Sequence, residues 1–275
     1  ILCVASHYSS RYQSSDKFLN QCNEKTTVEH ILFLQQNMAD DIVNCFIDKH
    51  IEPCEKSCIS NKNMLFIWKK YLNEKNLPNI LLHETLLSML KEKIKYNADD
   101  EIFVGVTSKI LPIVAEFINF WDTTVIECTN DFIATAEYEI DEIVVLFKKW
   151  TNKKFNDIED FFILELIRHL YVNNDGNIHI DDDKYIVNIK CELWDKSLEV
   201  TESLTLFKDE YSEEFKELTN YNIKSLSDAY TYYVLYKKDG LVISKHYFDK
   251  VAKDIMSEFL DSDGLINNSW FINVS

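Results

Sequence analysis

The stretch Leu111-Pro-Ile-Val-Ala-Glu-Phe-Ile-Asn-Phe-Trp121 is apolar on almost every side when it is drawn as a helix. Pro112 falls in the first turn, where a missing backbone N–H is tolerated because first-turn N–H groups have no acceptor inside the helix. A helix that is apolar all round needs other elements around it. We therefore predict a buried helix near the centre of a helical domain.

Amphipathic segments flank this helix on both sides. Apolar residues recur at helical spacing in residues 28–47, 64–72 and 82–94 before it and in 138–150, 157–170 and 198–218 after it. Pro53 and Pro78 interrupt the earlier segments, because the residue before a proline is pushed away from helical geometry. The periodicity predicts a mainly α fold with a multi-helix body.

The period changes from helix to strand in one central place. Residues 177–180 and 184–190 alternate apolar and polar side chains across a short acidic turn. This alternation over a tight turn is typical of a β-hairpin. The hairpin makes the predicted class mainly α (α+β) rather than purely α.

The last fifty residues have an order of their own. Ser225 and Ser244 can each cap a helix, and residues 241–243 have the composition of a short strand. Residues 265–266 and 270–272 complete the order as two strands of a small hairpin. Helix, strand, helix and hairpin is the order of a winged-helix module, so we predict a C-terminal winged-helix-like module, although an ordinary α+β cap has the same order.

These patterns divide the chain into four predicted regions. They are a polar linker to a missing upstream domain (1–25), a helical domain (26–172), a hairpin with an acidic helix (173–220) and the winged-helix-like module (221–275). Because the chain begins at Ile1, we expect it to be a segment of a longer polypeptide.

Composition excludes several function classes. Only four glycines occur, and no two of them are close enough to form a phosphate-cradling loop. We therefore predict no nucleotide cofactor and no catalysis within this segment.

The seven cysteines are best interpreted as reduced intracellular thiols. No stretch approaches the ~20 apolar residues that span a bilayer, so no membrane partner is predicted.

The formal net charge of −17 opposes broad attraction to nucleic acid, so any contact must be local. Two basic groups are candidates for nucleic-acid binding. The first consists of Lys148, Lys149, Lys153 and Lys154 around Trp150. The second consists of Lys245, His246, Lys250 and Lys253 in a helix after Ser244. The first group could instead close a helix C-terminus. The second basic group shares its helix with acidic residues, so the alternative that the winged helix contacts protein instead of DNA remains open.

Metal binding is not predicted, although two groups contain suitable ligands. Cys45, His50, Cys54 and Cys58 lack the two-residue spacing of a zinc knuckle, and zinc stays an open alternative there. His179, Asp181, Asp182 and Asp183 fall at the predicted hairpin turn, where consecutive side chains point to opposite faces. A solvated turn is the favoured interpretation, and a metal-dependent nuclease is a remote one.

Several short strings together resemble one family. They are His7-Tyr-Ser-Ser-Arg-Tyr12, Ser15-Asp-Lys-Phe-Leu19, Phe120-Trp121, Asp183-Lys-Tyr-Ile186, Cys191-Glu-Leu-Trp-Asp-Lys196 and Ile243-Ser-Lys-His-Tyr-Phe-Asp-Lys250. The strings resemble the region that follows the ATPase core in D5-like primase-helicases of large cytoplasmic DNA viruses. The resemblance implies a winged-helix-like end and ATP hydrolysis upstream, and no enzymatic residue of the family has a counterpart here.

From these observations we predict a non-catalytic C-terminal accessory region of a viral DNA replication protein that contacts DNA or partner subunits. Its expected partners are upstream domains of the same polypeptide, DNA, other replication proteins and a second copy of itself. Its expected location is the viral replication site in the host cytoplasm. The alternative is a helical protein interaction or scaffold module without nucleic-acid binding.

Overall fold

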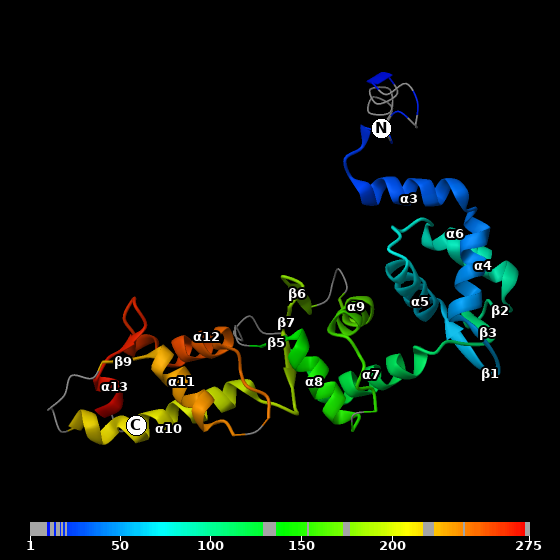
Figure 1. Cartoon of the computed structure of the whole chain (residues 1–275). Coiled ribbons are helices and arrows are strands. Elements are labelled where there is room, and N and C mark those ends of the chain that lie inside the picture. The colour runs from blue at the N-terminus through cyan, green and yellow to red at the C-terminus, as the bar shows by residue number, and fades with distance from the viewer. Residues whose placement is uncertain are drawn as a thin grey trace. The chain divides into compact units, whose positions relative to one another are not determined.

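The computed structural model describes residues 10, 11, 14, 17, 19, 21–128, 136–152, 154–172, 177–216, 223–238 and 240–272 (Figure 1). The chain forms two compact units, Ile1–Val114 and Ala115–Ser275. This division falls inside the region 26–172, where the sequence pattern indicates no boundary. Helices joined by small antiparallel sheets dominate the described residues, which confirms the mainly α (α+β) prediction. The predicted linker 1–25 lies largely outside the described residues.

The first unit packs helices against a small sheet. Its helices are α3 (Lys25–Gln36), α4 (Ala39–His50), α5 (Asn61–Glu74) and α6 (His83–Lys93). The sheet has the order β1-β3-β2 and is formed by β1 (Glu52–Ser60), β2 (Tyr96–Asn97) and β3 (Ile102–Thr107). The ring of Trp68 meets Phe46 edge-on at 5.1 Å in its core.

The sequence pattern did not predict strand β1. The register of β1 against β3 shifts between Pro53 and Cys58, so the side chains of this strand lose the strict alternation that marks a strand. Most of the strand is also exposed or half-buried. An irregular edge strand with few apolar side chains carries little signal in the sequence.

The second unit begins with three helices. They are α7 (Leu111–Thr124), whose first residues belong to the first unit, α8 (Ile140–Trp150) and α9 (Asp160–Leu170). Phe117 of α7 meets Phe147 of α8 edge-on at 5.2 Å. The helix that the sequence predicts to be buried is buried on one side only, because Pro112, Ala115 and Asn119 are exposed. One face of α7 supplies the core and the other meets solvent.

The predicted hairpin is confirmed by strands β6 (His179–Asp181) and β7 (Tyr185–Val187). Strand β5 (Glu137–Glu139) pairs with β7 and completes a sheet of order β5-β7-β6. Asn188 has a φ of 67° and separates β7 from β8 (Ile189–Cys191). Strand β8 pairs with β4 (Val125–Glu127), so the left-handed residue passes the chain from one sheet to the next.

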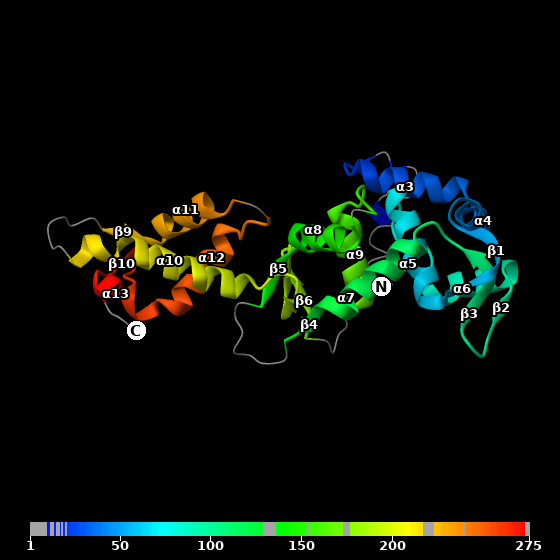
Figure 2. The ribbon, with the colours of Figure 1, turned by 90° about the horizontal axis from the view of Figure 1, so that it is seen from below.

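The C-terminal part of the second unit is a helical bundle. Helices α11 (Leu226–Tyr236), α12 (Lys245–Ile255) and α13 (Ser269–Ile272) lie along α10 (Lys196–Lys216), as Figure 2 shows. A short 3-10 turn, η1 (Ser257–Phe259), follows α12, and strands β9 (Lys224–Ser225) and β10 (Leu265–Ile266) pair antiparallel. The predicted caps are confirmed, because Ser225 and Ser244 accept the N–H of Asp228 and Tyr247.

Two strand predictions in this part are wrong. Residues 241–243 form no strand, because the N–H of Ile243 is donated to the hydroxyl of Tyr233 instead of a strand partner. Residues 270–272 belong to α13, since Trp270 and Phe271 are both buried, which adjacent strand residues would not be. The hairpin predicted from 265–272 is therefore replaced by the pairing of β10 with β9.

Within the described ranges, no helix combines the length and the apolar character needed to cross a membrane.

Candidate functional site

A pocket of about 400 Å³ lies in the second unit where α8 ends, α10 begins and the chain leaves α11. Two tryptophans and two lysines line it together with apolar side chains, and the full set is Leu146, Lys149, Trp150, Leu193, Trp194, Lys237, Gly240 and Leu241. The volume is that of a small-molecule site. Indole rings beside ammonium groups suit a flat ligand that carries negative charge.

Both tryptophans of the pocket are half-buried and held by neighbours. The ring of Trp150 meets Phe120 of α7 edge-on at 5.9 Å. The ring of Trp194 meets Tyr138 at 6.4 Å, and its Nε1 donates to Glu199 Oε2 at 2.7 Å. The two indoles are therefore in place before any ligand arrives, which lowers the entropy cost of binding.

The two lysines of the pocket differ in their partners. Lys237 Nζ lies 2.5 Å from Glu199 Oε1, which also accepts the hydroxyl of Tyr233 at 2.7 Å. Lys149 is exposed, and no carboxylate of the described residues pairs with it. Among the described residues, the pocket thus has one cation paired with a carboxylate, Lys237, and one exposed cation without such a partner, Lys149.

Glu199 holds the pocket residues Trp194 and Lys237 in place, and these contacts in turn favour its ionised form. Burial alone would raise the pKa of Glu199, but the hydrogen bonds from Lys237, Tyr233 and Trp194 hold it below its usual value. A carboxyl group with a lowered pKa in the folded state stabilises the protein at neutral pH. That stability is lost as the pH falls through the folded pKa.

Glu199→Gln is accordingly expected to destabilise the second unit by about 1 kcal/mol at pH 7. The difference from the wild type should shrink as the pH falls below about 4.3, where the unfolded carboxyl group binds its proton. Thermal unfolding followed by near-UV circular dichroism between pH 3 and 8 measures this. Glu202→Gln, an exposed change on the same helix, is the control. A difference that stays constant down to pH 3 contradicts the prediction.

The structure brings part of the first predicted basic group to this pocket. Lys149 and Trp150 line it, whereas Lys148 is half-buried at the end of α8 and outside the lining. Lys154 Nζ pairs with Glu116 Oε1 at 2.8 Å, and Lys153 lies outside the described residues. The sequence pattern did not indicate Trp194 and Lys237, because they are far from this group along the chain.

The second predicted basic group, on α12, is largely paired with acids of the same unit. Lys250 Nζ lies 2.6 Å from Glu137 Oε2, and His246 Nε2 lies 3.9 Å from Glu137 Oε1. Lys245 Nζ lies 3.3 Å from Asp249 Oδ2, while Lys253 is exposed. A phosphate at this helix would compete with those carboxylates. The positive charge of α12 that remains to attract a phosphate is therefore small.

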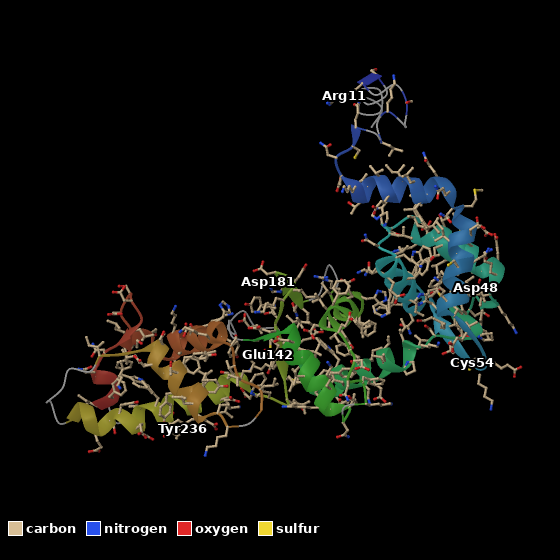
Figure 3. The ribbon with its side chains drawn as sticks, in the orientation of Figure 1. Arg11, Asp48, Cys54, Glu142, Asp181 and Tyr236 are labelled. Carbon is tan, nitrogen blue, oxygen red and sulfur yellow. The ribbon has the colours of Figure 1, made fainter. Side chains whose placement is uncertain are left out.

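A buried ionic cluster lies beside the pocket and was not predicted. Lys196 Nζ, whose side chain is 1% exposed, lies 2.6 Å from Glu142 Oε2. Its ammonium group faces three aromatic rings, with centroid distances of 3.9 Å to Tyr247, 5.0 Å to Tyr138 and 5.6 Å to Trp194. Burial lowers the pKa of Lys196 and raises that of Glu142, so desolvation outweighs their attraction. Glu142 is labelled in Figure 3.

Two further buried glutamates of β5 belong to the same ionic cluster. Glu139 Oε2 lies 2.8 Å from Lys184 Nζ of the hairpin turn, and Glu137 receives Lys250 of α12. The cluster therefore links α8 and its sheet to α10 and α12. In the sequence these glutamates look like the acidic start of a helix, which explains why the pattern did not indicate a cluster.

The described residues contain no group of three or more His, Cys, Asp and Glu side chains placed to hold a metal ion. His50 Nε2 lies 3.3 Å from Glu74 Oε2, Cys54 Sγ lies 3.0 Å from Ser57 Oγ, and Cys58 is exposed. At the acidic turn, Arg168 pairs with both Glu165 and Asp183. Neither of the two metal-capable groups of the sequence converges on one point.

A scan against protein-family models, a search of curated proteins and a search of solved structures each found no match to this chain. The chemistry of the pocket is therefore argued from its own side chains.

Proposed function

We propose that this chain is a non-catalytic accessory region of a viral DNA replication protein, and that it contacts single-stranded DNA at the pocket of Trp150 and Trp194. The observation that carries the proposal is the position of two fixed indoles beside Lys149, which is exposed and pairs with no carboxylate among the residues that the structure describes. Aromatic rings stack on bases whatever their sequence, and a nearby ammonium group attracts the phosphate backbone.

A single strand suits this pocket better than a duplex. A pocket of about 400 Å³ accepts one flat group, whereas the bases of a duplex are already stacked on one another. Helix α12, the expected reader of a duplex, has Lys250 and His246 turned to Glu137. The net charge of −17 also favours a short local contact over an extended one.

The class of parent protein is part of the proposal. Its support is the resemblance of the short strings to D5-like primase-helicases, together with the scarcity of glycine that leaves no triphosphate loop in this segment. Upstream domains of the same polypeptide would then supply ATP hydrolysis in the host cytoplasm. The segment would guide the displaced strand or dock partner subunits.

Trp150→Ala tests the proposal most directly. Loss of one base stack is expected to weaken binding of a fluorescein-labelled oligo-dT roughly 5- to 150-fold in an anisotropy titration at 50 mM salt. Trp150→Phe keeps an aromatic face and should retain most of the affinity. Lys149→Ala should lower the salt dependence by about 0.7 in log–log slope, the value for one phosphate on a single strand.

Lys253→Ala, which removes an exposed lysine of α12, is the matched control and should leave oligo-dT binding unchanged. Equal weakening by Lys253→Ala would indicate nonspecific attraction and overturn the pocket as the site. Absence of binding at low salt would favour the second candidate, a helical protein interaction module without nucleic acid. That candidate is supported by the pairing of the α12 cations with carboxylates.

A further inference from the structure

A second surface of the C-terminal bundle exposes apolar side chains next to one another. We call it the tyrosine face, and its residues are Leu206 of α10 and Tyr232, Leu235 and Tyr236 of α11. Leu206, Leu235 and Tyr236 are 53%, 76% and 55% exposed. The three α11 residues share one side of their helix, because they are spaced three and four positions apart. Tyr236 is labelled in Figure 3.

Contacts between α10 and α11 show that this face is continuous. The Tyr232 hydroxyl lies 3.5 Å from the carbonyl oxygen of Leu206, and the rings of Tyr232 and Tyr236 stack at 4.2 Å. Beneath them, buried Phe207 meets the ring of Tyr232 edge-on at 5.5 Å. The core of the bundle therefore fixes the side chains of the tyrosine face. Binding of a partner would not carry the entropy cost of ordering them.

Acidic side chains surround the tyrosine face. Glu202, Asp209 and Glu210 are exposed along the same side of α10 as Leu206. The carboxylate of Glu210 is close enough to Tyr232 to affect its ionisation. Partial burial, a hydrogen bond with Tyr236 and the charge of Glu210 together raise the pKa of Tyr232 to about 12. The surface thus combines apolar anchors with a negative rim.

We propose that the tyrosine face binds a basic amphipathic segment of a partner protein, in which Lys or Arg side chains flank Leu or Phe side chains. The apolar side chains would cover Leu206, Leu235 and Tyr236, and the cations would meet the acidic rim. A second copy of this chain fits poorly, because a twofold contact would bring the same carboxylates together. Nucleic acid is disfavoured by the same charge.

The inference uses residues outside the pocket of Trp150 and does not depend on DNA binding. Its test is an anisotropy titration of the full chain with a labelled 18-residue helical peptide of Lys and Leu, the leucines placed on one side, at 150 mM salt. Leu206→Ser combined with Tyr236→Ser is expected to weaken binding at least about tenfold. A separate double variant, Glu202→Lys with Glu210→Lys, should weaken peptide binding more than the Leu206→Ser and Tyr236→Ser variant does.

Leu82→Ser is the control, because Leu82 is an exposed leucine, at 78%, that belongs to the first unit. It should leave peptide binding unchanged, and a peptide of Glu and Leu should not bind. Equal weakening by Leu82→Ser, or binding of the acidic peptide, overturns the inference. So does concentration-dependent dimerisation that the double variant abolishes. Near-UV circular dichroism identifies any variant that fails to fold, and Leu206→Ala with Tyr236→Ala then replaces it.

Discussion

Lys196→Ala is expected to destabilise the second unit by about 3–5 kcal/mol at pH 7. The change removes the partner of Glu142 but leaves this carboxylate buried, 5% exposed. It also removes the cation from the ring of Tyr247, 3.9 Å away. Urea unfolding followed by tryptophan fluorescence measures the loss.

The loss should depend on pH in a defined direction. Burial already raises the pKa of Glu142, and removing the ammonium group raises it further. A carboxyl group whose folded pKa lies above its unfolded value destabilises the fold as the pH rises past about 4.3. The effect of Lys196→Ala should therefore be smaller at pH 5 than at pH 7. An effect that grows on acidification contradicts this account.

A double variant separates the charge from the packing. Lys196→Met with Glu142→Gln removes both charges and keeps similar volumes, and the glutamine can still accept the N–H of Glu139 as Glu142 does at 2.9 Å. Replacing both members of a buried pair is often neutral. We expect this variant to recover most of the stability. If it is as unstable as Lys196→Ala, packing around the stem of Lys196 dominates.

Trp68→Ala is expected to destabilise the first unit by about 3–5 kcal/mol, the usual cost of removing a large buried ring. Trp68 is 2% exposed and contacts Phe46 and Tyr71. Its Nε1 has no hydrogen-bond partner in the part of the chain that the structure describes. The cost should therefore come from lost packing and the cavity left behind.

Hydrogen exchange read separately over the two units tests whether the damage stays local. Because each unit has its own core, Trp68→Ala should increase exchange in residues 39–107 and leave α10 and α12 as protected as before. Leu82→Ala, at a leucine that is 78% exposed, is the control and should cost less than about 0.5 kcal/mol. Equal loss of protection in both units would show that they unfold together.

The helices were predictable because each has a local cause. Apolar residues at helical spacing indicate α4, α5 and α8, and Ser225 and Ser244 cap α11 and α12 as their side chains predict. The acidic hairpin of β6 and β7 was predictable for the same reason. Asp182 and Asp183 adopt the positive φ values, 50° and 55°, that its tight turn requires.

The strands of the first unit and the end of the chain were less predictable. Strand β1 owes its place to pairing with β3, about fifty residues away, and its own side chains are mostly polar. The pair Trp270 and Phe271 looks like part of a strand but forms a helical turn, because Phe207 of α10 offers both rings a place in the core. Tertiary packing overrides a weak local preference.

The sequence by itself determined the helical class, the caps, the hairpin and the exclusion of a triphosphate loop, because each follows from neighbours within a few residues. Only the tertiary structure decided the site. Trp150 and Trp194 meet at one pocket, and Lys250 meets Glu137 across 113 residues of chain. Which distant side chains share a pocket, and which cations find a carboxylate, depends on how helices pack, and that information is spread over the whole chain.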